Sequence, residues 1–73
     1  MKEFYALYNQ VKEGKMLRVH TEFKTGEGGS IKIYEGTGLQ KRQILKVEVE
    51  EVEERAECYK RAKNALQNWA NRQ

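Results

Sequence analysis

The sequence predicts an α+β domain in which a helix, three antiparallel strands and a second helix follow one another. Two segments, residues 2–13 and 51–71, carry apolar residues at the 3.6-residue spacing of an amphipathic helix. The stretches between them alternate apolar and polar residues and are separated by glycine-rich breaks, as strands with one buried face are. This order predicts a three-stranded meander with both helices packed on one face of the sheet. Residues 1–73 are expected to form a single small domain, because so short a chain cannot build two cores.

The first helix is expected over residues 2–13. Gly14 follows it, at the place where a helix often ends in a residue with positive φ. Tyr5 lies off the main apolar stripe and next to Tyr8, so it is a candidate for contact with a partner. The stripe itself consists of Phe4, Leu7, Tyr8 and Val11.

Residues 15–24 and 30–35 are expected to form a hairpin. Strict alternation in the first segment places one set of side chains in the core and the other in solvent. In the second segment, Ile31 and Ile33 point to one face, and Lys32 and Tyr34 point to the other. The glycine-rich stretch 25–29 supplies the turn. The residues expected to face the core from the first strand are Leu17, Val19, Thr21 and Phe23.

Residues 44–50 fit two descriptions. Alternation of Leu45, Val47 and Val49 with charged residues predicts a third strand. The same region also fits a helical stripe that would extend the last helix backward to residue 45. The β-branched valines favour the strand. We therefore expect a strand over residues 44–50 and a helix over 51–71, whose apolar stripe is Val52, Ala56, Tyr59, Ala62, Leu66 and Trp69.

The charges are segregated along the chain. Fourteen basic and 11 acidic residues give a net charge of +3, yet residues 48–57 hold six Glu and a single Arg. The macrodipole of the last helix favours acids near its N-terminus and cations toward its other end, which explains much of this pattern. Double-stranded RNA-binding domains share the α-β-β-β-α order, but they place lysines at the start of the last helix. This chain instead has Glu50, Glu51, Glu53 and Glu54 there, so we do not assign it to that family.

The sequence lacks the residues that most catalytic sites require. Ser30, His20 and Cys58 are each the sole residue of their type, which is too few for a convincing triad or a structural zinc site. The glycine-rich turns match no phosphate-binding motif. We therefore expect a non-enzymatic protein with no catalytic residue, metal, cofactor or small-molecule substrate. No apolar run approaches the ~20 residues of a membrane span, and no apolar segment suggests a secretory signal. One unpaired cysteine indicates a reducing compartment, so a cytoplasmic location is expected.

The favoured functional hypothesis is a small protein-interaction or regulatory module that binds a protein partner or a second copy of itself. It follows from the missing catalytic groups and from a core so small that its stability is marginal. The candidate contact residues are Tyr5, Met16 and Trp69. Trp69 also fits the end of the apolar stripe of the last helix, so it is a candidate for the core as well as for a partner contact.

The alternative hypothesis is a nucleic-acid-binding protein that uses the outer sheet face and the Lys41–Arg42 loop. Basic side chains beside an aromatic ring on an open sheet can contact phosphates and bases. The competing explanation is a solvated face on which Glu22 and Glu48 pair with cations across the strands. The candidate nucleic-acid-binding residues are Arg18, His20, Lys24, Lys32, Tyr34, Lys41, Arg42 and Lys46.

Overall fold

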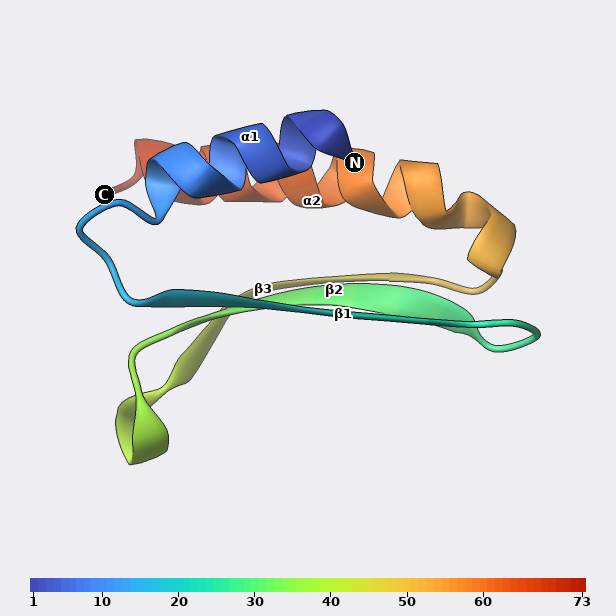
Figure 1. Cartoon of the computed structure of the whole chain (residues 1–73), viewed down its shortest axis with the longest axis horizontal. Coiled ribbons are helices and arrows are strands. Elements are labelled where there is room, and N and C mark those ends of the chain that lie inside the picture. The colour runs from blue at the N-terminus through green and yellow to red at the C-terminus, as the bar shows by residue number, and fades with distance from the viewer.

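The computed structural model describes residues 1–73 and shows a three-stranded antiparallel sheet with two helices above one of its faces (Figure 1). Helix α1 (Lys2–Val11) leads into strands β1 (Leu17–Lys24), β2 (Gly28–Glu35) and β3 (Arg42–Val49), and helix α2 (Arg55–Asn71) follows. The strands lie in the order β1-β2-β3, so β1 and β3 are the two edges. The predicted fold class, element order and layering are confirmed.

The ambiguous segment around residue 45 is a strand. Ile31 of β2 lies opposite Val47, and Ile33 lies opposite Leu45, so the valine alternation does mark a buried strand face. The strand nevertheless begins at Arg42, two residues earlier than predicted. A register shift after Ile33 places Tyr34 opposite Gln43, which leaves one extra residue in β3. Such a bulge interrupts period-two alternation and hides the beginning of the strand from a pattern search.

The last helix is preceded by a 3-10 turn, η2 (Val52–Glu54). Glu51 and Glu54 form a capping box: the Glu54 side chain accepts a hydrogen bond from the backbone N–H of Glu51 at 3.1 Å, and Glu51 accepts one in return. This reciprocal cap gives part of the acidic block a local structural role. The expected macrodipole pattern holds only in part, because the last turn of α2 contains no cation. Within α2, Glu57 and Arg61 form an i,i+4 ion pair at 3.4 Å.

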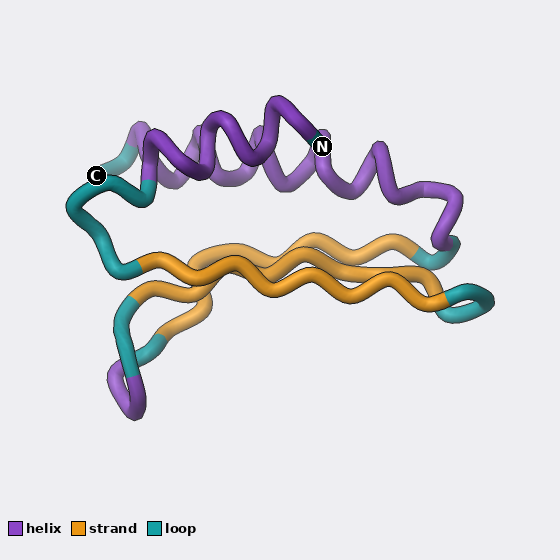
Figure 2. The backbone as a smooth tube through the Cα atoms, in the orientation of Figure 1, coloured by secondary structure: helices purple, strands orange, loops and turns teal.

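The core lies between the sheet and the two helices, which cover the same face (Figure 2). Its most deeply buried large side chains come from α1, β2 and α2 and include Phe4, Ile33 and Leu66. Trp69 is only 7% exposed and belongs to this core. This burial agrees with the interpretation that its ring completes the apolar stripe of α2, while its role as a contact residue stays a prediction.

Candidate functional site

The face of the sheet opposite the helices has no covering element (Figures 1 and 2). We call it the open face. Directly opposed residues of an antiparallel pair share a face, so the strand register arranges its side chains in rows. The rows are Arg18–Tyr34–Gln43, His20–Lys32–Lys46 and Glu22–Ser30–Glu48, and Lys24 lies beyond the last row.

Basic residues gather at the end of the open face where β2 leaves the sheet. Lys32, at its centre, is half-buried and lies between His20 on one side and Lys46 on the other. Arg18 lies opposite Tyr34 in the neighbouring row. Like charges directly opposite each other destabilise a sheet, so Lys32 beside Lys46 is an unfavourable pair in the free protein. We call the set Arg18, His20, Lys32, Tyr34, Lys41 and Lys46 the basic end.

Tyr34 is less available than its sequence position suggests. The side chain is half-buried, and Lys41 Nζ lies 4.8 Å from the centre of its ring, in a cation–π contact. The contact fixes Lys41 above the basic end. It also covers a ring that was expected to be exposed, so a base could stack on Tyr34 only after displacing the ammonium group.

Ion pairs on the open face run along the strands and not across them. Lys24 pairs with Glu22 at 3.9 Å, and Lys46 pairs with Glu48 at 2.9 Å. The hydrogen bond and charge of Lys46 lower the pKa of Glu48, and Glu48 in turn raises the pKa of Lys46. The expected pairing across strands is thus wrong, because alternation already places residues i and i+2 side by side on one face.

Arg42 is not one of the free cations. It lies in β3 and not in the loop, directly opposite Glu35. Its guanidinium donates to Glu35 Oε1 through two nitrogens, at 2.9 and 3.3 Å. The structure thus corrects the placement of Arg42 in the loop, whereas its membership of the nucleic-acid-binding set stays a prediction. Among the remaining candidates, Arg18, Lys32 and Lys41 form no ion pair.

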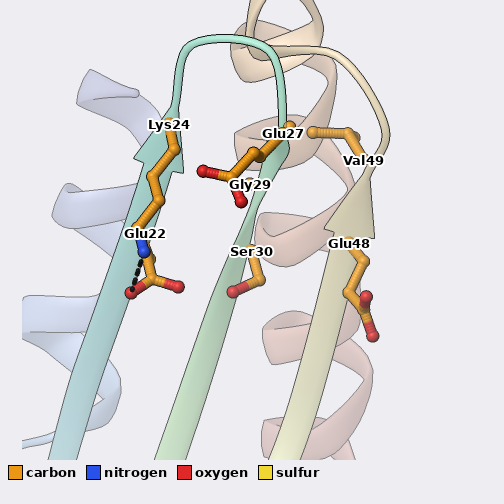
Figure 3. Close-up of a pocket in the computed structure, with 8 residues that line it drawn as sticks. Glu22, Lys24, Glu27, Gly29, Ser30, Glu48 and Val49 are labelled. Atoms are coloured by element: carbon orange, nitrogen blue, oxygen red, sulfur yellow. Dashed lines mark ion pairs between the residues drawn. The ribbon is translucent and has the colours of Figure 1, made fainter.

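The opposite end of the open face is acidic (Figure 3). Glu22, Glu27 and Glu48 surround Ser30 beneath the β1–β2 turn, and the Lys24 ammonium group is paired with Glu22. The hollow between them measures about 200 Å³, smaller than a typical small-molecule pocket, and its lining is almost entirely polar. We call Glu22, Glu27 and Glu48 the acidic end. The open face is therefore divided along the strand direction into two halves of opposite charge.

The β2–β3 loop projects from the sheet on the side of the open face (Figures 1 and 2). Its 3-10 turn η1 (Gly38–Gln40) carries Leu39, whose side chain is fully exposed. Gly36 has a φ of +97°, and a Cβ there would lie 2.8 Å from the carbonyl oxygen of Gln40. Sterics that only glycine meets therefore set the direction of the loop. Leu39 was missed in the sequence, although it is a large apolar residue that fits no periodic stripe.

The three predicted protein-contact residues do not form one surface. Tyr5 is half-buried, and its hydroxyl lies 3.3 Å from that of Tyr59, within an aromatic cluster at the edge of the core. Trp69 is in the core, as described above. Met16 alone is well exposed, at 60%. The other large exposed apolar residues are Met1 and Leu39, so no continuous apolar face is present on the molecule.

Two further features outside the open face bear on chemistry. A groove of about 390 Å³ runs between the start of α1 and the middle of α2, with Phe4 and Tyr59 in its lining and Lys60 and Lys63 at its side. Cys58 is fully buried, its Sγ lies 3.7 Å from the carbonyl oxygen of Val47, and burial raises the pKa of its thiol. A thiol in this environment is a packing residue and a poor nucleophile.

The structure contains no cluster of three or more His, Cys or acidic side chains that could hold a metal ion. None of its helices combines the length and the apolar character needed to cross a membrane. Comparisons with protein-family models, with curated proteins and with solved structures gave no significant match.

Proposed function

We propose that the chain is a non-enzymatic binding module whose ligand is nucleic acid and whose binding surface is the basic end of the open face. The observation that carries this proposal is the direct opposition of Lys32 and Lys46 at the centre of an uncovered sheet face. A bound phosphate would replace repulsion between the two ammonium groups with attraction to both. Arg18 and Lys41 form no ion pair and are available to a neighbouring phosphate.

The distribution of apolar surface supports this ligand over an obligate protein partner. Stable homodimers bury an apolar, well-packed interface. The exposed large apolar residues of this chain are three, Met1, Met16 and Leu39, and most of the other apolar residues are packed in the core or against it. A charged face with few apolar groups suits the phosphate backbone better than a second copy of itself.

Fluorescence anisotropy with short labelled oligonucleotides tests the proposal. Removing two phosphate contacts with Arg18→Ala/Lys32→Ala should weaken binding strongly and flatten the plot of log affinity against log salt by about 1.4, at ~0.7 per contact for a single strand. The matched control is Lys60→Ala/Lys63→Ala, which removes the same charge from the helical layer. Absence of binding at low salt, or equal losses in both double variants, would overturn the proposal.

A protein-interaction or regulatory role is the second candidate, and one observation favours it. Strands β1 and β3 are both eight residues long and both form edges of the sheet, so each presents unpaired backbone groups to a strand from a partner or a second copy. Light scattering coupled to size-exclusion chromatography tests self-association. A measured molar mass equal to that of one chain over a wide range of protein concentration would exclude the homodimer.

We also propose that the protein works in the cytoplasm. The support is Cys58, a reduced, buried thiol with no second cysteine in the chain to pair with. Fractionation of the native host followed by immunodetection tests the location. Recovery of the protein mainly outside the cytoplasmic fraction would contradict it.

A further inference from the structure

We propose that the nucleic acid is a single strand that crosses the three β-strands at the basic end, with Leu39 packed against one of its bases. This inference rests on the proposed function and deepens it. Two borders define the path: the acidic end lies on one side of it, and the projecting β2–β3 loop lies on the other.

The charge boundary sets the direction of the path. A phosphate chain that ran parallel to the strands would pass from the row of Lys32 to the row that holds Glu22 and Glu48. A chain that runs across the strands meets Arg18 in one row and Lys32 with Lys46 in the next. The crossing path therefore keeps its phosphates beside cations and away from carboxylates.

The width of the basic end favours a single strand over a duplex. Neighbouring rows on one face are two residues apart, which is roughly 7 Å along a strand. Cations occupy two rows, and the third row already contains Glu22 and Glu48. The major groove alone separates the two backbones of B-form DNA by about 12 Å. A duplex that presented its major groove to the basic end would thus bring its second phosphate chain over the acidic end.

Leu39 supplies the apolar contact that the covered Tyr34 ring does not. Lys41 lies over that ring, whereas nothing in the chain contacts the fully exposed Leu39 side chain. The turn that carries Leu39 is held by backbone hydrogen bonds from Gln40 to Thr37 at 3.1 Å and from Lys41 to Gly38 at 3.3 Å. Leucine is among the apolar side chains that insert between the base steps of bent duplexes and partly unstack them, so a leucine side chain can pack on the face of a base. The unpaired bases of a single strand present the apolar faces that this contact needs.

Competition anisotropy with three probes tests this inference: a labelled single-stranded oligonucleotide, its duplex, and unlabelled inorganic polyphosphate. The single strand should bind at least 10-fold more tightly than the duplex. Leu39→Ala should weaken single-strand binding several-fold and leave competition by polyphosphate unchanged, because polyphosphate has no bases. Gln40→Ala, in the same turn, is the matched control and should behave as the wild type. Leu39→Trp should restore or tighten binding, since an aromatic ring stacks better on a base.

The border itself is tested with Glu22→Gln/Glu48→Gln, which should raise duplex affinity more than single-strand affinity. Duplex binding equal to or tighter than single-strand binding would overturn the inference while leaving the proposed function in place. The same holds if Leu39→Ala changes nothing or weakens polyphosphate competition equally. Failure of both oligonucleotides to bind at low salt would instead overturn the proposed function and this inference with it.

Discussion

Lys32 of β2 and Lys46 of β3 lie directly opposite each other at the centre of the open face. The 2.9 Å ion pair of Lys46 with Glu48 offsets part of the repulsion between the two ammonium groups. Lys32 has no such partner and is half-buried. The pair therefore weakens the sheet in the free protein. Residues that lower the stability of the free protein are common at binding sites, where a bound ligand compensates for the unfavourable contact.

Replacing Lys32 should separate stability from binding. Lys32→Glu turns the repulsion into an attraction with Lys46, so the midpoint of urea unfolding should rise, with Lys32→Gln intermediate. Affinity for a single-stranded oligonucleotide should fall in both variants and most in Lys32→Glu. Urea denaturation and anisotropy on the same preparations check the prediction, and a wild-type protein more stable than both variants would refute it.

The β1–β2 turn should tolerate substitution at one glycine and not at another. Gly26 and Gly28 both have positive φ, at 81° and 79°. A Cβ at Gly26 meets open space, whereas a Cβ at Gly28 would overlap the carbonyl oxygen of Val49. Gly26→Ala should cost only the backbone strain, ~1–2 kcal/mol. Gly28→Ala adds overpacking of typically ~1–3 kcal/mol more. Chemical denaturation measures the free energy of unfolding of both variants. Equal losses of stability would show that β3 moves away from the added Cβ at little cost.

Stability should fall at alkaline pH because of Tyr59. Burial, with a smaller contribution from the Tyr5 hydroxyl, raises the pKa of Tyr59 from 10.0 to about 12. Above pH 10 the unfolded chain ionises this group while the folded chain holds it neutral, so stability is lost between pH 10 and pH 12.

Tyr5→Phe should lower the pKa of Tyr59 in the folded chain, so the loss of stability should still begin near pH 10 but should be smaller and end at a lower pH. Tyr34→Phe should leave the titration of Tyr59 in place. Ultraviolet titration of tyrosinate, combined with unfolding curves at several pH values, follows both effects. If the titration of Tyr59 in the folded protein and the size of the alkaline stability loss were the same in Tyr5→Phe as in the wild type, the assigned role of the hydroxyl pair would be contradicted.

Cys58 should react with thiol reagents only when the chain unfolds, because its side chain is fully buried and its pKa is raised. Phe4→Ala removes a nearly fully buried ring from the same core and should cost about 3–5 kcal/mol, so labelling should accelerate. Mass spectrometry of labelling time courses gives the rates. Rapid labelling of the native wild-type protein would show that Cys58 is accessible.

Periodicity was sufficient to predict the elements and the faces of the sheet. Alternation separates Lys32 from Ile31 and Ile33 without any knowledge of the fold. Alternation does not determine the strand register, because the register depends on turn geometry and on the bulge beside Ile33. The sequence therefore could not show that Lys32 faces Lys46, or that Arg42 faces Glu35.

The periodic pattern also could not predict the environment of each side chain. Trp69 fitted both the core and a contact surface, and only the packing of α2 on the sheet distinguishes them. Leu39 fell in a glycine-rich break, where no periodicity predicts burial or exposure. Its exposure follows from the glycine geometry that directs the β2–β3 loop away from the sheet.

The most direct measurement is an NMR titration of the isotope-labelled protein with a short single-stranded oligonucleotide. The backbone amides of Arg18, His20, Lys32 and Leu39 should shift in proportion to occupancy, while those of Glu27 and of Lys60 on α2 should stay in place. Shifts confined to the helical layer, or spread evenly over both ends of the open face, would contradict binding at the basic end.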